Sequence, residues 1–193
     1  MIQEQVLLLK RKSKIRQMLE SMLDSLLSHK EMLVLGSFVA SAAVLRSLMQ
    51  VVPSFEPITF FAVLAGMLYG SRKGFIVGAS SLYISNFICF GGQGPWTVFQ
   101  AFCFGSAGFI GGFFRRKINY GTALIAMTAS TILFEIVMNG FSAVFWGGNV
   151  ILAFGMAIPF MAMHFSTNFG LAFLLPKGKK GIRKLMERFK KRQ

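Results

Sequence analysis

The stretch SRKGFIVGASSLYISNFICFGGQGPWTVFQAFCFGSAGFIGGFFRRK, residues 71–117, contains two apolar segments, Gly74–Phe90 and Thr97–Phe114. Lys and Arg stand only at its two ends, and the connection GGQGPW between the segments is uncharged. Apolar segments of this length match a hydrocarbon core about 30 Å thick, and basic residues collect on the cytoplasmic side of a membrane. The stretch therefore predicts a membrane hairpin with cytoplasmic ends and an outward-facing turn.

The rest of the chain repeats this pattern. It has 193 residues, is 54% hydrophobic and contains only seven acidic residues, with long uncharged runs between clusters of charge. We predict an all-α integral membrane protein with six transmembrane helices. The segments are Met32–Val52, Ile58–Gly70, Gly74–Phe90, Thr97–Phe114, Asn119–Asn139 and Val150–Leu175. The second is short for a span, so we expect it to be tilted or to begin inside the protein.

The distribution of charge predicts the orientation. Of the 21 basic residues, 20 lie before the first segment, after the second, after the fourth or after the sixth. With six spans these four regions share one side of the membrane, so both termini are expected in the cytoplasm. Because the basic residues flank apolar segments and do not line one surface, we do not expect nucleic-acid binding despite the net charge of +14.

We divide the chain into a basic N-terminal segment, residues 1–31, a six-helix domain, 32–175, and a basic cytoplasmic tail, 176–193. Residues 15–27 place apolar side chains at steps of three and four behind a basic run, which predicts an amphipathic helix. This helix has two possible partners, an anionic lipid surface or another subunit. We expect no cleavable signal peptide.

No catalytic or metal-binding motif is visible. Cys89 and Cys103 lack CxxC spacing, and His29 and His164 lack a second ligand at helical spacing. No phosphate-binding loop is present, so we expect neither an enzyme nor a cofactor in this chain.

Three ionisable residues lie in or near the predicted spans, where a charge is costly and usually meets a partner or a wet cavity. Arg46 and Glu56 flank the first outward connection. They either form a salt bridge that holds this connection or contact a ligand. For Glu135, near the outer end of the fifth segment, either snorkelling to the interface or a hydrogen bond to a neighbouring helix is a sufficient explanation.

Polar and aromatic residues gather at the outer ends of the segments. Tryptophan residues alone would be explained by the aromatic belt that membrane proteins have at the membrane–water interface. That belt does not explain the neighbouring amides or the Gly-Gln-Gly-Pro backbone, which suit a small-molecule pocket. The residues predicted to bind substrate are Arg46, Phe55, Glu56, Asn86, Gln93, Trp96, Phe99, Gln100, Asn139, Trp146 and Asn149. Small residues at four-residue intervals predict close helix packing. In the first segment, Gly36, Ala40 and Ala43 form a face that suits a separate subunit.

Residues 54–114 resemble the core of substrate-binding S components of energy-coupling factor (ECF) vitamin transporters. The shared features are Glu-Pro-Ile-Thr at 56–59, Ser-Asn-Phe at 85–87, and Gly-Gln-Gly-Pro-Trp-Thr at 92–97, followed by Gln100. The last string is similar to that of cobalamin-type S components, while riboflavin, pantothenate and a pyridoxine-like ring also suit the residues.

The resemblance implies a protein of the prokaryotic plasma membrane that binds a vitamin from outside. It implies partners as well: a transmembrane coupling subunit, on which the S component topples to deliver its ligand inward, and two cytosolic ATPases. In the family an Ala-xxx-Ala motif of the first helix makes the docking surface, and here Gly36 replaces its first Ala. A stand-alone permease or channel is the main alternative, and it requires a continuous polar path through the spans.

Overall fold

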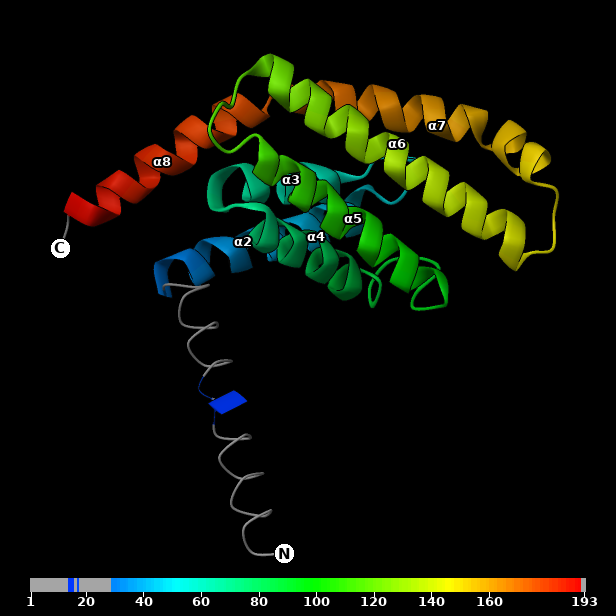
Figure 1. Ribbon diagram of the computed structural model, residues 1–193, viewed down its shortest axis with the longest axis horizontal. Helices are drawn as coiled ribbons and strands as arrows, with labels where there is room; N and C mark the ends of the chain where they lie inside the picture. The colour runs from blue at the N-terminus through cyan, green and yellow to red at the C-terminus, as the bar shows by residue number, and fades with distance from the viewer. Residues whose placement is uncertain (1–13, 16, 18–28, 192–193) are drawn as a thin grey trace, which may run out of the picture. The chain divides into compact units, whose positions relative to one another are not determined.

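The structure, a computed structural model, describes residues 14–15, 17 and 29–191, so most of the predicted N-terminal amphipathic helix lies outside the described residues. The chain divides into two compact units, Met1–Leu35 and Gly36–Gln193. The described part contains seven helices (Figure 1). They are α2 (His29–Met49), α3 (Pro57–Tyr69), α4 (Ser71–Ser85), α5 (Trp96–Phe113), α6 (Tyr120–Phe145), α7 (Val150–Ala172) and α8 (Leu175–Lys191).

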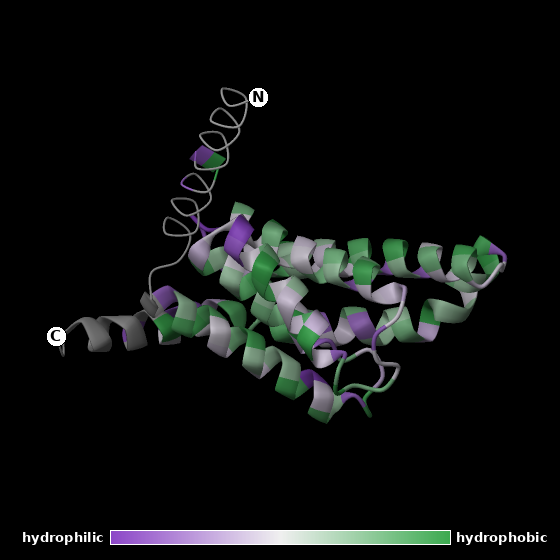
Figure 2. Cartoon of the chain, turned by 90° about the horizontal axis from the view of Figure 1, so that it is seen from below, coloured by the Kyte–Doolittle hydropathy of each residue, from purple (hydrophilic) through white to green (hydrophobic). Residues whose placement is uncertain are grey.

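Helices α2 to α7 fall on the six predicted apolar segments, which confirms the all-helical prediction. Figure 2 shows apolar residues along the length of these helices. Among the described residues, three helical stretches are long and apolar enough to cross a membrane, namely Glu31–Met49, Tyr120–Phe145 and Val150–Ala172. The apolar helix α3 has only 13 residues, about 20 Å at 1.5 Å per residue.

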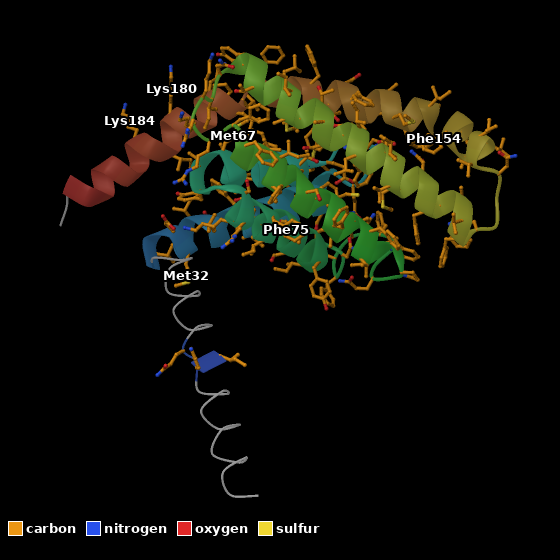
Figure 3. All side chains as sticks on the ribbon, in the orientation of Figure 1. Met32, Met67, Phe75, Phe154, Lys180 and Lys184 are labelled. Carbon is orange, nitrogen blue, oxygen red and sulfur yellow. The ribbon has the colours of Figure 1, made fainter. Side chains whose placement is uncertain are left out.

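Two predicted boundaries are wrong. The third segment was expected to be helical to Phe90, but α4 ends at Ser85. The chain then turns through Gly91 and Gly92, whose φ angles of 88° and 55° favour glycine. The fifth segment was expected to end at Asn139, but α6 continues to Phe145, which leaves a shorter connection before α7 than predicted. The basic tail is helical as α8, where Lys180 and Lys184 project from the same side (Figure 3).

Glycines bring α3, α4 and α5 into backbone contact. A Cβ atom added at Gly108 of α5 would lie 2.8 Å from the Cα of Gly74, and one at Gly66 would lie 2.8 Å from the amide nitrogen of Gly112. Real Cβ atoms do not approach other atoms so closely. The small residues at these intervals therefore serve packing inside the bundle, as predicted, because lipid supplies little drive for helix association.

An aromatic ring completes the contact between α4 and α5. Phe75 of α4, labelled in Figure 3, packs over Gly105 of α5, where an added Cβ would lie 2.7 Å from the ring. A buried cluster then joins α2, α3, α4 and α5, and each helix contributes one residue: Ala42, Ile58, Leu82 and Phe104. This core holds the four helices whose ends carry most of the predicted site.

The short helix α3 begins inside the protein, which confirms one of the two expectations for this segment. The hydroxyl of Thr167, near the end of α7, donates a hydrogen bond to the carbonyl oxygen of Ser54 at 3.2 Å. The connection between α2 and α3 therefore reaches far along α7 before α3 starts. As a result Glu56, the residue before α3, is placed among the helices.

Candidate functional site

Arg46 organises one polar cluster inside the bundle. From α2, its Nη1 donates hydrogen bonds to Ser85 Oγ at 2.9 Å and to Asn86 Oδ1 at 2.7 Å, at the end of α4. Its Nε lies 3.4 Å from Glu56 Oε2, and the two side chains are only 13% and 19% exposed. The predicted salt bridge is therefore present, and it ties the α2–α3 connection to α2 and α4.

Asn86 extends this cluster to α5. Its Nδ2 donates to Thr97 Oγ1 and to Gln100 Oε1, each at 3.3 Å. The same Thr97 hydroxyl oxygen accepts a hydrogen bond from the backbone N–H of Gly94 at 3.0 Å, which fixes the turn before the helix. The structure therefore joins four of the predicted residues, Arg46, Glu56, Asn86 and Gln100, in one network.

The Gly-Gln-Gly-Pro-Trp turn folds back on itself. The Trp96 ring covers Gly94, where an added Cβ would lie 2.6 Å from Cε2, and its Nε1 donates to the carbonyl oxygen of Gly92 at 3.4 Å. Gln93 Nε2 donates to the carbonyl oxygen of Tyr83 at 2.8 Å. Gly94 is needed because the indole occupies the space that a side chain would take, whereas Gly92 is favoured by its φ of 55°. Both predicted residues of this turn thus build the loop above the Arg46 cluster.

A second polar cluster joins α6 and α7, which run side by side in Figure 1. His164 Nδ1 lies 2.7 Å from Glu135 Oε1, and Asn139 Nδ2 donates to Glu135 Oε2 at 2.9 Å. One turn away, Asn168 Nδ2 donates to Thr131 Oγ1 at 2.8 Å. The two antiparallel helices are therefore connected by two sets of polar contacts within apolar surroundings.

Sequence reasoning did not assign Thr131, His164 or Asn168 to the site, and it gave Glu135 only a packing role. One signal was available: Thr131 and Glu135 stand four residues apart, as do His164 and Asn168, on adjacent predicted helices. Residues at this spacing share a helix face. Which face of one helix meets which face of the next depends on packing, and the sequence pattern does not specify it.

Two buried polar atoms have neither a hydrogen bond nor an ion pair within the described part of the chain: His164 Nε2 and Asn168 Oδ1. Glu56 Oε2 accepts no hydrogen bond, but it is the atom that faces Arg46 Nε in the ion pair. Burial raises the pKa of Glu56, while the guanidinium of Arg46 acts in the opposite direction. An unpaired buried polar atom costs about 1–3 kcal/mol, so His164 and Asn168 are the candidate residues for contact with a ligand.

Aromatic rings link the start of α5 to the end of α6. The ring centroids of Phe99 and Phe141 are 4.5 Å apart, those of Phe141 and Phe145 are 5.1 Å apart, and those of Phe145 and Trp146 are 5.0 Å apart. Trp146 remains 73% exposed at the end of this row. Its ring is placed to meet lipid headgroups or an incoming ligand rather than to fill the core.

The remaining predicted residues lie outside both clusters. Phe55 is half-buried beside Glu56. Asn149 caps α7 by accepting hydrogen bonds from the backbone N–H groups of Ile151 and Leu152. On α2, Gly36 and Ala40 are exposed, whereas Ala43 is buried and does not belong to the exposed small face.

Comparison with known families gives a result that agrees with this architecture. The family model described as ECF transporter, substrate-specific component, matches residues 30–184, most of the chain. Neither a search of curated proteins nor a search of solved structures found a match. Substrate-specific components are non-catalytic subunits that work with an ECF module in membrane transport, and this confirms the prediction that the chain is not an enzyme. The chain therefore belongs to the family of substrate-specific components of ECF transporters.

Proposed function

We propose that this chain binds a vitamin from the outer side of the membrane, at the two polar clusters between α2, α4, α6 and α7. The single observation that carries the proposal is the pair of unpartnered buried atoms, His164 Nε2 and Asn168 Oδ1, within an otherwise apolar bundle. Binding sites for small organic molecules combine such apolar walls with a few placed polar groups. The loop closed by Trp96 lies next to the Arg46 cluster and would cover this site.

We propose the following topology and partners. Helices α2 to α7 cross the membrane and both termini are cytoplasmic, because the basic residues then share the inner side. The exposed small face of α2, which includes Gly36, Ala40 and Ser41, packs against a transmembrane coupling subunit. Two cytosolic ATPases bound to that subunit supply the energy, so the chain needs no cofactor of its own.

Cobalamin is the first vitamin to test, because the string Gly-Gln-Gly-Pro-Trp-Thr at 92–97 is similar to that of cobalamin-type S components. The amides that led to this expectation are engaged inside the protein, since Gln93 and Asn86 both donate to other groups of the chain. Riboflavin, pantothenate and pyridoxine therefore belong in the same panel.

The proposal is tested with the full chain purified in lipid nanodiscs. We expect calorimetric titration to show saturable binding of one vitamin in a one-to-one complex, and mass spectrometry to find a vitamin among the molecules released by denaturation. Absence of any bound vitamin, together with solute flux through liposomes that contain the chain alone, would refute the proposal in favour of a stand-alone permease.

A further inference from the structure

We infer that the turn after α4, residues 86–90, inserts into the hydrocarbon of the outer leaflet, where Phe87, Ile88 and Phe90 contact lipid acyl chains. We name these five residues the apolar turn. The inference rests on the proposed function, whose topology places this turn at the outer side, and it goes beyond that function by assigning lipid as the partner of this surface.

Helix α4 is too short to cross the hydrocarbon core, and its contacts with α5 show how far the pair reaches. The two helices lie side by side (Figure 1). At one end, a Cβ atom added at Gly112 of α5 would meet Ser71, the first residue of α4. At the other end, Asn86 donates to Thr97. The 15 residues of α4 rise about 22 Å, whereas the core is about 30 Å thick.

Basic residues place one end of this helix pair at the inner boundary of the core. Arg72 and Lys73 lie in the first turn of α4, and residues 115–117, which are all basic, follow α5. Long basic side chains reach the headgroups, so Ser71 lies near this boundary. A helix that starts there and rises about 22 Å ends about 8 Å short of the outer boundary. Any tilt of the helix would place its end still deeper.

The side chains of the apolar turn suit this depth. Phe87, Ile88 and Phe90 are 68%, 62% and 82% exposed. No Lys, Arg, Asp or Glu stands between Lys73 and Arg115 in the sequence, so no charge holds the turn in water. One exposed phenylalanine is ordinary, but three large apolar side chains within five residues form a patch that favours contact with lipid.

The backbone of the apolar turn is hydrogen-bonded from within the chain. The N–H groups of residues 86–89 donate to carbonyl oxygens near the end of α4, namely those of Leu82, Ile84 and Ser85. The N–H of Phe90 donates to Gln50 Oε1 at 2.8 Å, a side chain that follows α2. Hydrocarbon offers no water as an acceptor, so non-helical backbone at this depth requires acceptors from the protein. The contact with Gln50 supplies the one that α4 does not.

The test measures the depth of a nitroxide label by electron paramagnetic resonance of the full chain in nanodiscs. The label is attached to one introduced cysteine, at Phe87→Cys or Phe90→Cys. Its collisions with oxygen, which concentrates in lipid, are compared with its collisions with a water-soluble nickel chelate. Cys89 and Cys103 are buried, so the unmodified chain gives the background. We expect both variants to favour oxygen, as Ile132→Cys does at an exposed position midway along α6.

The matched control is Gly148→Cys, in the connection between α6 and α7. The 26 residues of α6 rise about 39 Å, so this connection extends beyond the core. A Cβ atom added at Gly148 has its nearest neighbour at 3.9 Å, so the substitution fits. We expect the nickel chelate to collide several-fold less often with the labels of the apolar turn than with this control.

Equal collision with the nickel chelate at Gly148→Cys and at both turn positions would overturn the inference. Rare collision with both reagents would also overturn it, because protein would then cover the turn. A nanodisc exposes both faces to the chelate, so the measurement requires neither a known orientation nor a bound vitamin. Failure of the proposed function would appear separately, as absence of binding in the calorimetric titration of the same nanodiscs.

Discussion

Replacement of Arg46 by methionine tests the energetic role of the first polar cluster. Methionine keeps a long apolar side chain but removes the hydrogen bonds to Ser85 and Asn86 and the ion pair with Glu56. Loss of one partner from a buried ion pair costs about 3–5 kcal/mol. Because the two side chains keep 13% and 19% exposure, we use the lower end, about 3 kcal/mol.

For a chain of this length, each kcal/mol corresponds to about 2–4 °C in the melting temperature, so Arg46→Met should melt about 6–12 °C lower. Thermal unfolding of the purified chain in detergent measures this shift. The control Arg116→Met removes an exposed charge and should change the melting temperature little. The double variant Arg46→Met with Glu56→Gln should regain about half of the lost melting temperature, because the second substitution removes the carboxylate that Arg46→Met leaves without a counter-charge.

The same variant should respond to pH. Burial raises the pKa of Glu56 above its usual 4.5, so the folded chain binds this proton more tightly than the unfolded chain. The resulting stability is present at low pH and is lost as the pH rises through the folded pKa. The penalty of Arg46→Met should therefore be smaller near pH 5 than near pH 8. A melting temperature equal to that of Arg116→Met, or a double variant no more stable than the single one, would refute this reasoning.

Four further substitutions, one of them a control, test other parts of the structure. Gly108→Ala should destabilise the chain by about 3 kcal/mol, because the new methyl group meets the Gly74 backbone on α4. Gly155→Ala, where nothing lies within 4 Å, should be neutral or stabilising in the same melting assay. Trp96→Ala should weaken vitamin binding at least tenfold, about 1.4 kcal/mol, in calorimetric titration, and unchanged affinity would remove this ring from the site. Thr97→Val should lower the melting temperature by about 2–4 °C, corresponding to about 1 kcal/mol, because Gly94 and Asn86 lose their acceptor.

Hydropathy predicted the helices well because the apolar segments are long and separated by charge or glycine. It placed the end of α4 too late because residues 86–90 are mostly apolar, and the turn there depends on backbone angles at Gly91 and Gly92. The Arg46–Glu56 pair was predictable because these two opposite charges flank a single connection. Asn86 was expected beside the turn as a substrate contact, and its hydrogen bonds to Arg46 and Gln100 depend on helix packing that the sequence pattern does not specify.

The second cluster shows where sequence reasoning stops. Glu135 and His164 are 29 residues apart, and each is alone among apolar neighbours in sequence. Their contact depends on the rotation and offset of α6 against α7, which packing of many apolar side chains determines together. Four-residue spacing shows which polar residues share a face of one helix. Which face of the neighbouring helix they contact is known only from the assembled bundle.

An experimental structure of the full chain with its bound vitamin tests the account most directly. The account predicts ligand density between the start of α3 and the face of α7 that carries His164 and Asn168. A polar group of the ligand should lie about 3 Å from His164 Nε2, Asn168 Oδ1 or both. A vitamin held elsewhere, or one that places only apolar atoms against these two side chains, would contradict the account.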